Sequence, residues 1–209
     1  MVTTDTGDGP PARPGTGRRG KEGSDMADGG TAATASDAPG RGDRTEASVT
    51  AIDQARFRAI LGRFATGVVA ITGVDPATDR PTGLAANAFT SVSLDPPLVA
   101  FCVAHTSSTW PKLRAAPTVC VNILSDRQEH VCRQLAARGA DKFDGLTWDG
   151  APGGSPVIDG AIAWIECAVE QEHVAGDHVI VVARVLELDR HHDGTPLIFY
   201  RGGYGGFAG

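Results

Sequence analysis

Apolar positions follow a helical spacing at one point of the chain and strand-like spacings after it. Phe57, Ile60, Leu61 and Phe64 recur at the i, i+3, i+4, i+7 spacing of one helix face, which predicts a helix over residues 53–65. Later apolar runs are short, rich in β-branched residues and bounded by Gly, Pro or Asp, as is typical of strands. The predicted strands cover residues 66–73, 82–93, 98–104, 118–124, 161–174, 178–188 and 196–200.

Two further helices are predicted from their start signals. Trp110 precedes Pro111, and proline is tolerated in the first turn of a helix. Ser125 followed by Gln128 is a capping-box pattern, and Gly139 is a suitable end for the helix that it opens. Residues 139–160 are expected to form a loop. Six or seven strands with two or three helices, not in strict β-α-β alternation, favour an α+β fold around a mostly antiparallel barrel.

The first fifty of the 209 residues differ from the rest. They hold 10 of the 27 glycines, no aromatic residue and four large apolar residues. Such a segment buries too little apolar surface to offset the entropy of ordering. We therefore expect a disordered tail over residues 1–50 and one domain over residues 51–209.

Charge and cysteine usage limit the classes of protein. The formal net charge of −6 argues against a nucleic-acid binder and against a polybasic membrane anchor. No apolar run approaches the ~20 residues that span a bilayer, and no apolar signal region follows the early arginines, so we expect a cytoplasmic protein. No C-x-x-C motif is present, and apolar neighbours predict buried free thiols at Cys102, Cys120, Cys132 and Cys167.

Common nucleotide, nucleophile and zinc motifs are missing, and three segments remain as candidates for chemistry. Residues 82–93 combine small side chains with Asn87, Thr90 and Ser91; they form either a backbone seat for a flat ligand or a plain strand with a polar face. Residues 105–112 place hydroxyl groups before a helix and Lys112 within it, which makes either a phosphate cradle or an ordinary cap.

The third candidate is the turn-like segment 176–178, Gly-Asp-His, between two long strands. His178 either points into a cleft or is a structural residue. Its five-residue separation from His173 does not match a metal-binding pair on one helix face, so no metal site is predicted.

Taken in order, these segments resemble the short-chain flavin reductase family. The resemblance spans about residues 52–204, and its most specific part is S-x-S-L-D-P-P-L at 91–98 followed by G-D-H at 176–178. It implies an FMN-binding split β-barrel, antiparallel and Greek-key-like, with two or three flanking helices. It also implies a homodimeric NAD(P)H:flavin oxidoreductase that passes hydride from NADH or NADPH to FMN or FAD and supplies reduced flavin to a separate monooxygenase.

The resemblance also implies roles for particular residues. The nicotinamide would face His178, and the closing loop would contribute Lys142 and Phe143, with Tyr204 as a weaker match. Ala88 stands where many relatives carry Ser, which removes a hydroxyl group near the flavin. The remaining flavin contacts would come from Ala86, Asn87, Ala88, Phe89 and Thr90 around the ring and ribityl chain and from Ser107, Ser108 and Thr109 near the phosphate.

Two other functions are compatible with the same barrel. One is a flavin-binding carrier or sensor without reductase turnover, which consumption of the nicotinamide would exclude. The other is a relative with different chemistry, such as a pyridoxamine-phosphate-oxidase-like or haem-handling protein. The stretch 91–98 and the G-D-H turn favour the reductase over this second alternative.

Overall fold

The computed structural model describes residues 52–139 and 141–207, and the predicted tail lies outside them. Three α-helices and a 3-10 turn occur in this part of the chain: α1 (Gln54–Leu61), α2 (Trp110–Ala115), the turn Asp126–Gln128 and α3 (Glu129–Ala136). None of these helices is long and apolar enough to cross a bilayer. The strands up to α2 are β1 (Thr66–Gly67), β2 (Val69–Asp75), β3 (Arg80–Ala86), β4 (Phe89–Leu94) and β5 (Pro97–Ala104). The later strands are β6 (Val119–Ile123), β7 (Trp148–Gly150), β8 (Pro156–Ile158), β9 (Ala163–Ala175), β10 (His178–Arg190), β11 (Leu197–Tyr200) and β12 (Gly203–Gly206).

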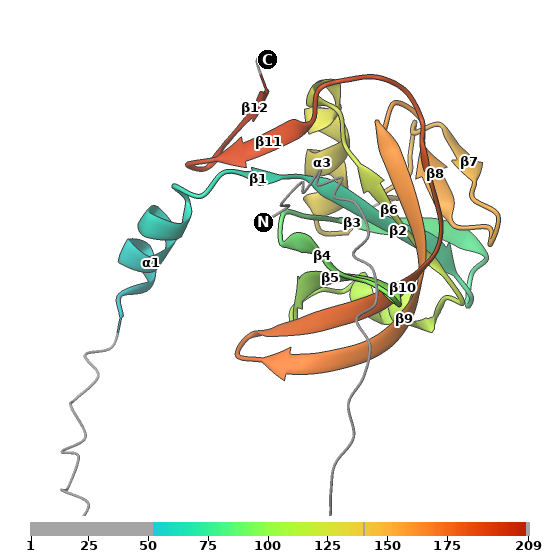
Figure 1. Cartoon of the computed structure of the whole chain (residues 1–209), viewed down its shortest axis with the longest axis horizontal. Helices are drawn as coiled ribbons and strands as arrows, with labels where there is room; N and C mark the ends of the chain where they lie inside the picture. The colour runs from blue at the N-terminus through green and yellow to red at the C-terminus, as the bar shows by residue number, and fades with distance from the viewer. Residues whose placement is uncertain (1–51, 140, 208–209) are drawn as a thin grey trace, which may run out of the picture. The chain divides into compact units, whose positions relative to one another are not determined.

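A seven-stranded sheet in the order β3-β2-β6-β9-β10-β5-β4 is the main layer, and every pairing in it is antiparallel (Figure 1). Strands β1, β11 and β12 form a smaller sheet, and β7 and β8 form a hairpin. The predicted mostly antiparallel α+β fold is therefore confirmed. Hydrogen bonding does not close the large sheet into a ring, because β3 and β4 are its two edge strands.

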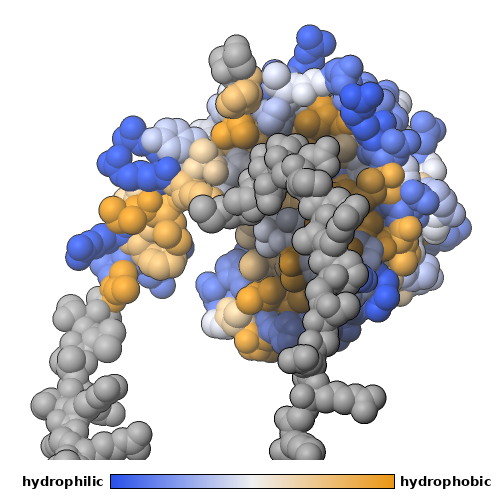
Figure 2. All heavy atoms as spheres, viewed as in Figure 1, coloured by the Kyte–Doolittle hydropathy of each residue, from blue (hydrophilic) through white to orange (hydrophobic). Residues whose placement is uncertain are grey.

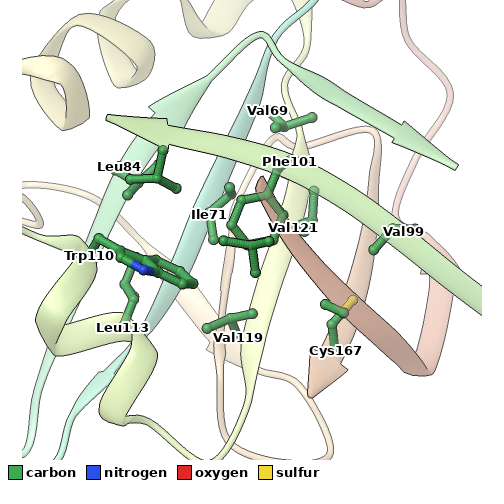
Figure 3. Packing of buried hydrophobic residues seen from close by; sticks show 13 residues of the cluster. Val69, Ile71, Leu84, Val99, Phe101, Trp110, Leu113, Val119, Val121 and Cys167 are labelled. Atoms are coloured by element: carbon green, nitrogen blue, oxygen red, sulfur yellow. The ribbon is translucent and has the colours of Figure 1, made fainter. Parts of the chain in front are cut away.

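Two apolar clusters hold α2 and α3 against the strands. The first contains Phe101, Ile71 and Val121, and Trp110 from α2 meets Phe101 edge-on with 5.6 Å between ring centroids (Figure 3). The second packs Leu135 of α3 with other buried residues that include Val68, Leu124, Phe143 and Leu197. Both clusters join residues far apart in the chain, so the burial that they provide depends on the complete sheet.

Some predicted elements are divided. The strand expected over residues 82–93 is two strands, because Asn87 and Ala88 leave the sheet between β3 and β4. The strand expected over residues 66–73 is likewise split at Val68 into β1 and β2. The segment expected to be a loop, residues 139–160, contains the β7–β8 hairpin, and β12 was not predicted. The helix that begins after Ser125 ends at Ala136, before Gly139.

A buried polar network explains the unexpected hairpin. The side-chain oxygen of Asn122 accepts a hydrogen bond from Ile158 N at 2.8 Å, and its amide nitrogen donates to Thr72 Oγ1 at 3.0 Å. Thr72 in turn donates to the carbonyl of Pro156. Because both side chains are fully buried, these bonds replace lost contacts with water and fix β8 against the large sheet.

Replacing Asn122 with alanine should lower the free energy of unfolding by about 2–4 kcal/mol, because Ile158 N–H would be left buried without an acceptor. Urea denaturation followed by tryptophan fluorescence measures this loss. The matched control is Asp149→Ala, which removes an exposed side chain from the same hairpin and should change stability by less than about 0.5 kcal/mol. Equal midpoints for the two variants would contradict a structural role for the network.

Candidate active site

A groove of about 1370 Å³ runs over one face of the large sheet. Its sheet side includes Cys102 of β5 and Ile180 of β10, which are cross-strand partners and therefore project from the same face. Its other side includes residues of α1 and of the segment that follows it, among them Phe57, Leu61 and Phe64. This space exceeds the roughly 300–1,000 Å³ of an ordinary ligand pocket, so it has room for a large ligand and for further protein.

The break between β3 and β4 supplies one wall of this groove. Cys102 N donates to the carbonyl of Ala88 at 3.1 Å, which holds the connection against β5. Asn87 and Ala88 are exposed, so their backbone is open to a ligand. Four of the residues predicted to contact the flavin line the groove together: Asn87, Ala88, Phe89 and Thr90. Ala86, the fifth, packs against the core cluster beside them.

A second cavity, of about 390 Å³, is lined mostly by polar and charged residues, and we call it the polar pocket. Its lining includes Ser108 and Thr109 from the start of α2 and Lys142 from the loop after α3, as the resemblance implies. Thr82 of β3 also lines it, and Asn87 at the groove is five residues away, about 16 Å at the rise of a strand. The groove and this polar pocket are thus separated by roughly one strand length.

Cations in the polar pocket have partners of different kinds. Lys112 Nζ lies 3.6 Å from Asp75 Oδ2, and Lys142 Nζ donates to the carbonyl of Leu135 at 2.7 Å. Partial burial lowers the pKa of Lys142, and the charge of Lys112 lowers it further. An anion bound between the two ammonium groups would oppose both effects, so the pocket is suited to a phosphate.

His178 begins β10 and projects from the same face of this strand as Ile180, two residues further on, which lines the groove. Its Nδ1 is 2.7 Å from Asp177 Oδ1, and this hydrogen bond is the main reason why the pKa of Asp177 is lowered. Gly176 provides the turn before it with a φ of +62°, a conformation that other residues rarely adopt. The turn therefore places an imidazole with a defined hydrogen-bond partner two residues along β10 from Ile180, outside the residues that line the groove.

Three further predicted site residues lie outside the lining of both cavities, as Ala86 and His178 do. Ser107 Oγ accepts a hydrogen bond from Trp110 N at 3.2 Å at the start of α2 and does not line the polar pocket. Phe143 is buried in the cluster under α3 and meets Trp148 edge-on.

Tyr204 is the third of these residues. Its hydroxyl accepts a hydrogen bond from Cys132 Sγ at 3.3 Å, and Arg133 lies over its ring, with 5.1 Å from Cζ to the ring centroid. The contact with Cys132 and partial burial raise the pKa of Tyr204 to about 12. Tyr204 thus connects β12 to α3, and its side chain lies outside the lining of both cavities.

Sequence reasoning did not find several residues that line the two cavities. Asp75, Arg80 and Asp141 line the polar pocket, and Cys102, Ile180 and Thr66 line the groove. Alternation along β5 and β10 places Cys102 and Ile180 on the outer face, but the sequence does not show that this face borders a groove. All four cysteines are free thiols, as predicted, and Cys120, Cys132 and Cys167 are buried. The prediction of burial is wrong for Cys102, which is partly exposed because its strand borders the groove.

Comparisons with known proteins agree with this geometry. The model of the flavin reductase like domain matches residues 61–208. A flavin reductase of Pseudomonas putida is 49% identical over 159 residues, which cover 76% of this chain and 93% of that protein. The reductase subunit of a flavin-dependent monooxygenase of Rhodococcus jostii is 42% identical over 156 residues, 75% of this chain and 79% of that subunit.

A solved structure gives the same result for the fold. The NADH:FAD oxidoreductase of Streptomyces globisporus, in complex with NAD and FAD fragments, superposes with a TM-score of 0.69 at 36% identity and covers 75% of this chain and 93% of its own. The mostly antiparallel sheet of this chain, with its groove and its cationic pocket, therefore has the fold of flavin reductases. The chain belongs to the flavin reductase family.

Proposed function

We propose that this chain is an NAD(P)H:flavin oxidoreductase that supplies reduced FMN or FAD to a partner monooxygenase. The observation that carries this function is one shared face: the open connection at Asn87 and Ala88, the groove and His178 all lie along β5 and β10. Flavin, when bound, accepts a hydride from the nicotinamide. The protein then needs to bind, orient and desolvate two cofactors, which requires no strong acid or nucleophile.

Residues at the β3–β4 connection fit a flavin ring. Asn87 and Thr90 offer polar groups, and the small side chains of Ala86 and Ala88 leave the backbone open to a flat ligand. Phe89 packs against the core and fixes the start of β4. Thr66 Oγ1 is buried at the groove without a hydrogen-bond partner among the described residues, and a polar group of the ligand would satisfy it.

Flavin phosphate is assigned to the polar pocket. Ser108 and Thr109 offer hydroxyl groups, and Lys112 and Lys142 offer charge. The ribityl chain would run along β3 from the ring toward this pocket. Ser107, Phe143 and Tyr204 act indirectly in this proposal: Ser107 caps α2, Phe143 anchors the loop that carries Lys142, and Tyr204 holds β12 against α3.

The nicotinamide is assigned to the groove near His178. The hydrogen bond with Asp177 fixes the orientation of the imidazole, so its Nε2 is available to the carboxamide of the dinucleotide. His178 thus orients the hydride donor and does not transfer a proton. We assign NADH as the donor because the structural relative described above is named for this cofactor.

We further propose that the active protein is a homodimer. Helix α1 buries none of its residues, and Phe64, which follows it, is 75% exposed. Figure 2 shows hydrophobic surface over α1. A helix of eight residues is marginal in water without tertiary packing. Ile180 of β10 lies on the sheet side of the groove and is also exposed. A second copy of the chain would cover both apolar walls of the groove and exclude water from the cofactors.

Residues 51–209 are proposed as one reductase domain. Its proposed compartment is the cytoplasm, because free thiols such as Cys120 and Cys167 persist in a reducing environment.

Turnover of nicotinamide tests the proposed activity. The full chain should oxidise NADH in the presence of catalytic FMN or FAD, measured as loss of absorbance at the nicotinamide band with each flavin and with NADPH in parallel. Oxygen reoxidises the flavin, so consumption should exceed one equivalent per chain. Flavin binding without consumption in any pairing would contradict a reductase and would indicate a carrier or sensor.

A further inference from the structure

Arg80 is the third cation of the polar pocket, and its counterion differs from those of the two lysines. It forms an ion pair with Asp141, which links the start of β3 to the loop after α3. The side chain of Arg80 is 67% exposed and that of Asp141 is 40% exposed. Exposed pairs of this kind contribute little to stability, so a stronger anion can replace the carboxylate.

The two lysines have more permanent partners. The side chain of Asp75, beside Lys112, is 8% exposed, and it also accepts a hydrogen bond from Ala77 N at 3.0 Å. Lys142 donates to a main-chain carbonyl, Leu135 O. These partners are fixed by the surrounding fold, whereas the partner of Arg80 is the half-exposed side chain of Asp141.

The carboxylate of Asp141 divides its contacts between its two oxygens. Oδ1 accepts a hydrogen bond from Phe143 N at 3.1 Å, which stabilises the turn that carries Lys142. Oδ2 pairs with Arg80. Arg80 can therefore leave Asp141 without loss of the hydrogen bond that shapes this turn.

We infer that Arg80 is a third phosphate-binding cation and that Asp141 competes with the flavin phosphate for it, so that this pair sets the affinity for phosphorylated flavins. The guanidinium group offers two parallel N–H groups that match two phosphate oxygens. In the flavin-free protein Asp141 pairs with this guanidinium group. The pair must break before Arg80 binds the phosphate, and this lowers the affinity for the flavin. This inference rests on the placement of the flavin phosphate in the polar pocket.

Affinity for three flavins tests the exchange. FMN, FAD and riboflavin, which lacks the phosphate, are titrated into the flavin-free full chain by calorimetry. Arg80→Met should weaken FMN and FAD about tenfold and leave riboflavin unchanged, because a charge-assisted hydrogen-bonding partner of the phosphate is lost. Asp141→Asn should tighten FMN and FAD a few fold, since the amide retains an oxygen for Phe143 N and does not compete for Arg80.

The double variant separates competition from simple repulsion. If Asp141 acts through Arg80, then Arg80→Met/Asp141→Asn should bind FMN as Arg80→Met does. The matched control is Arg190→Met, which breaks the exposed Arg190–Asp193 pair outside both cavities and should bind all three flavins as the unchanged protein does.

Other outcomes contradict the inference in distinguishable ways. Lys112→Met and Lys142→Met should each weaken FMN and not riboflavin, and circular dichroism confirms that they fold. If the lysine variants weaken FMN and Arg80→Met does not, the exchange is wrong and the phosphate pocket stands. If none of the Arg80, Lys112 and Lys142 variants changes the affinity for FMN, the phosphate lies elsewhere. Both the exchange and the placement of the phosphate in the polar pocket would then be wrong. A gain from Asp141→Asn that persists without Arg80 would also overturn the exchange.

Discussion

Replacing His178 with alanine should raise the KM for NADH by about tenfold or more and leave the affinity for flavin unchanged. The imidazole lies two residues along β10 from Ile180, which lines the groove, and in the proposed function it would donate to or accept from the carboxamide of the nicotinamide. Leaving the buried carboxamide without this partner costs about 1–3 kcal/mol, which weakens binding by about 5- to 150-fold. Steady-state oxidation of NADH at saturating FMN gives the KM, and quenching of flavin fluorescence gives the flavin affinity.

His130→Ala is the control for this substitution. His130 is exposed on α3, outside the lining of the groove, and its loss should change neither constant. An unchanged KM for NADH in His178→Ala would exclude the proposed role. A change in flavin affinity alone would place the histidine beside the flavin and would equally contradict the assignment to the nicotinamide.

Replacing Phe64 with glutamate should convert the protein from a dimer to a monomer at micromolar concentration. The phenylalanine side chain follows α1 and is largely exposed in the single chain, so in a dimer it would be a buried aromatic contact. Truncation of such a contact commonly costs 2 kcal/mol or more, and a buried charge costs more, so we expect the dissociation constant to rise by about 100-fold. Sedimentation velocity over a dilution series measures it.

Two further variants make this experiment specific. Ile180→Glu places a charge on the sheet side of the groove and should have the same effect as Phe64→Glu. Arg56→Glu changes charge on α1 at a residue outside the groove lining and should leave the dimer intact. Because Phe64 lines the groove, the mass rather than the activity is the deciding measurement. A dimeric Phe64→Glu variant, or a monomeric unchanged protein, would contradict the proposed assembly.

Local chemistry determined most of the elements. The helical spacing of apolar residues and Asp53, which accepts hydrogen bonds from Ala55 N and Arg56 N, specify the start of α1. Ser125 N donates to Gln128 Oε1 at 3.0 Å, as the capping-box pattern predicts. These features depend on residues within one helical turn of each other, so their spacing in the sequence is sufficient to find them.

The candidate site residues also differ in how far the sequence alone places them. Asn87, Ala88, Phe89 and Thr90 are consecutive, and wherever one of them meets a ligand the others are near. Their role came from the family resemblance, and the structure adds that they line one groove. Phe143 and Tyr204 matched the family pattern, but their side chains lie in the second core cluster, because burial under α3 stabilises a phenyl ring more than exposure in a cavity.

Tertiary structure alone decided which distant residues meet. Arg80 and Asp141 are 61 residues apart and pair only because α3 and its following loop pack beside β3. Asn122 reaches Ile158 for a similar reason, and this contact turns a Gly- and Pro-rich segment into a hairpin. The sequence by itself therefore determined the helices, most strands and the family. The order of strands in the sheet determined which residues line the groove and the polar pocket. Contacts between segments far apart in the chain arise from packing, so no regular spacing in the sequence reveals them.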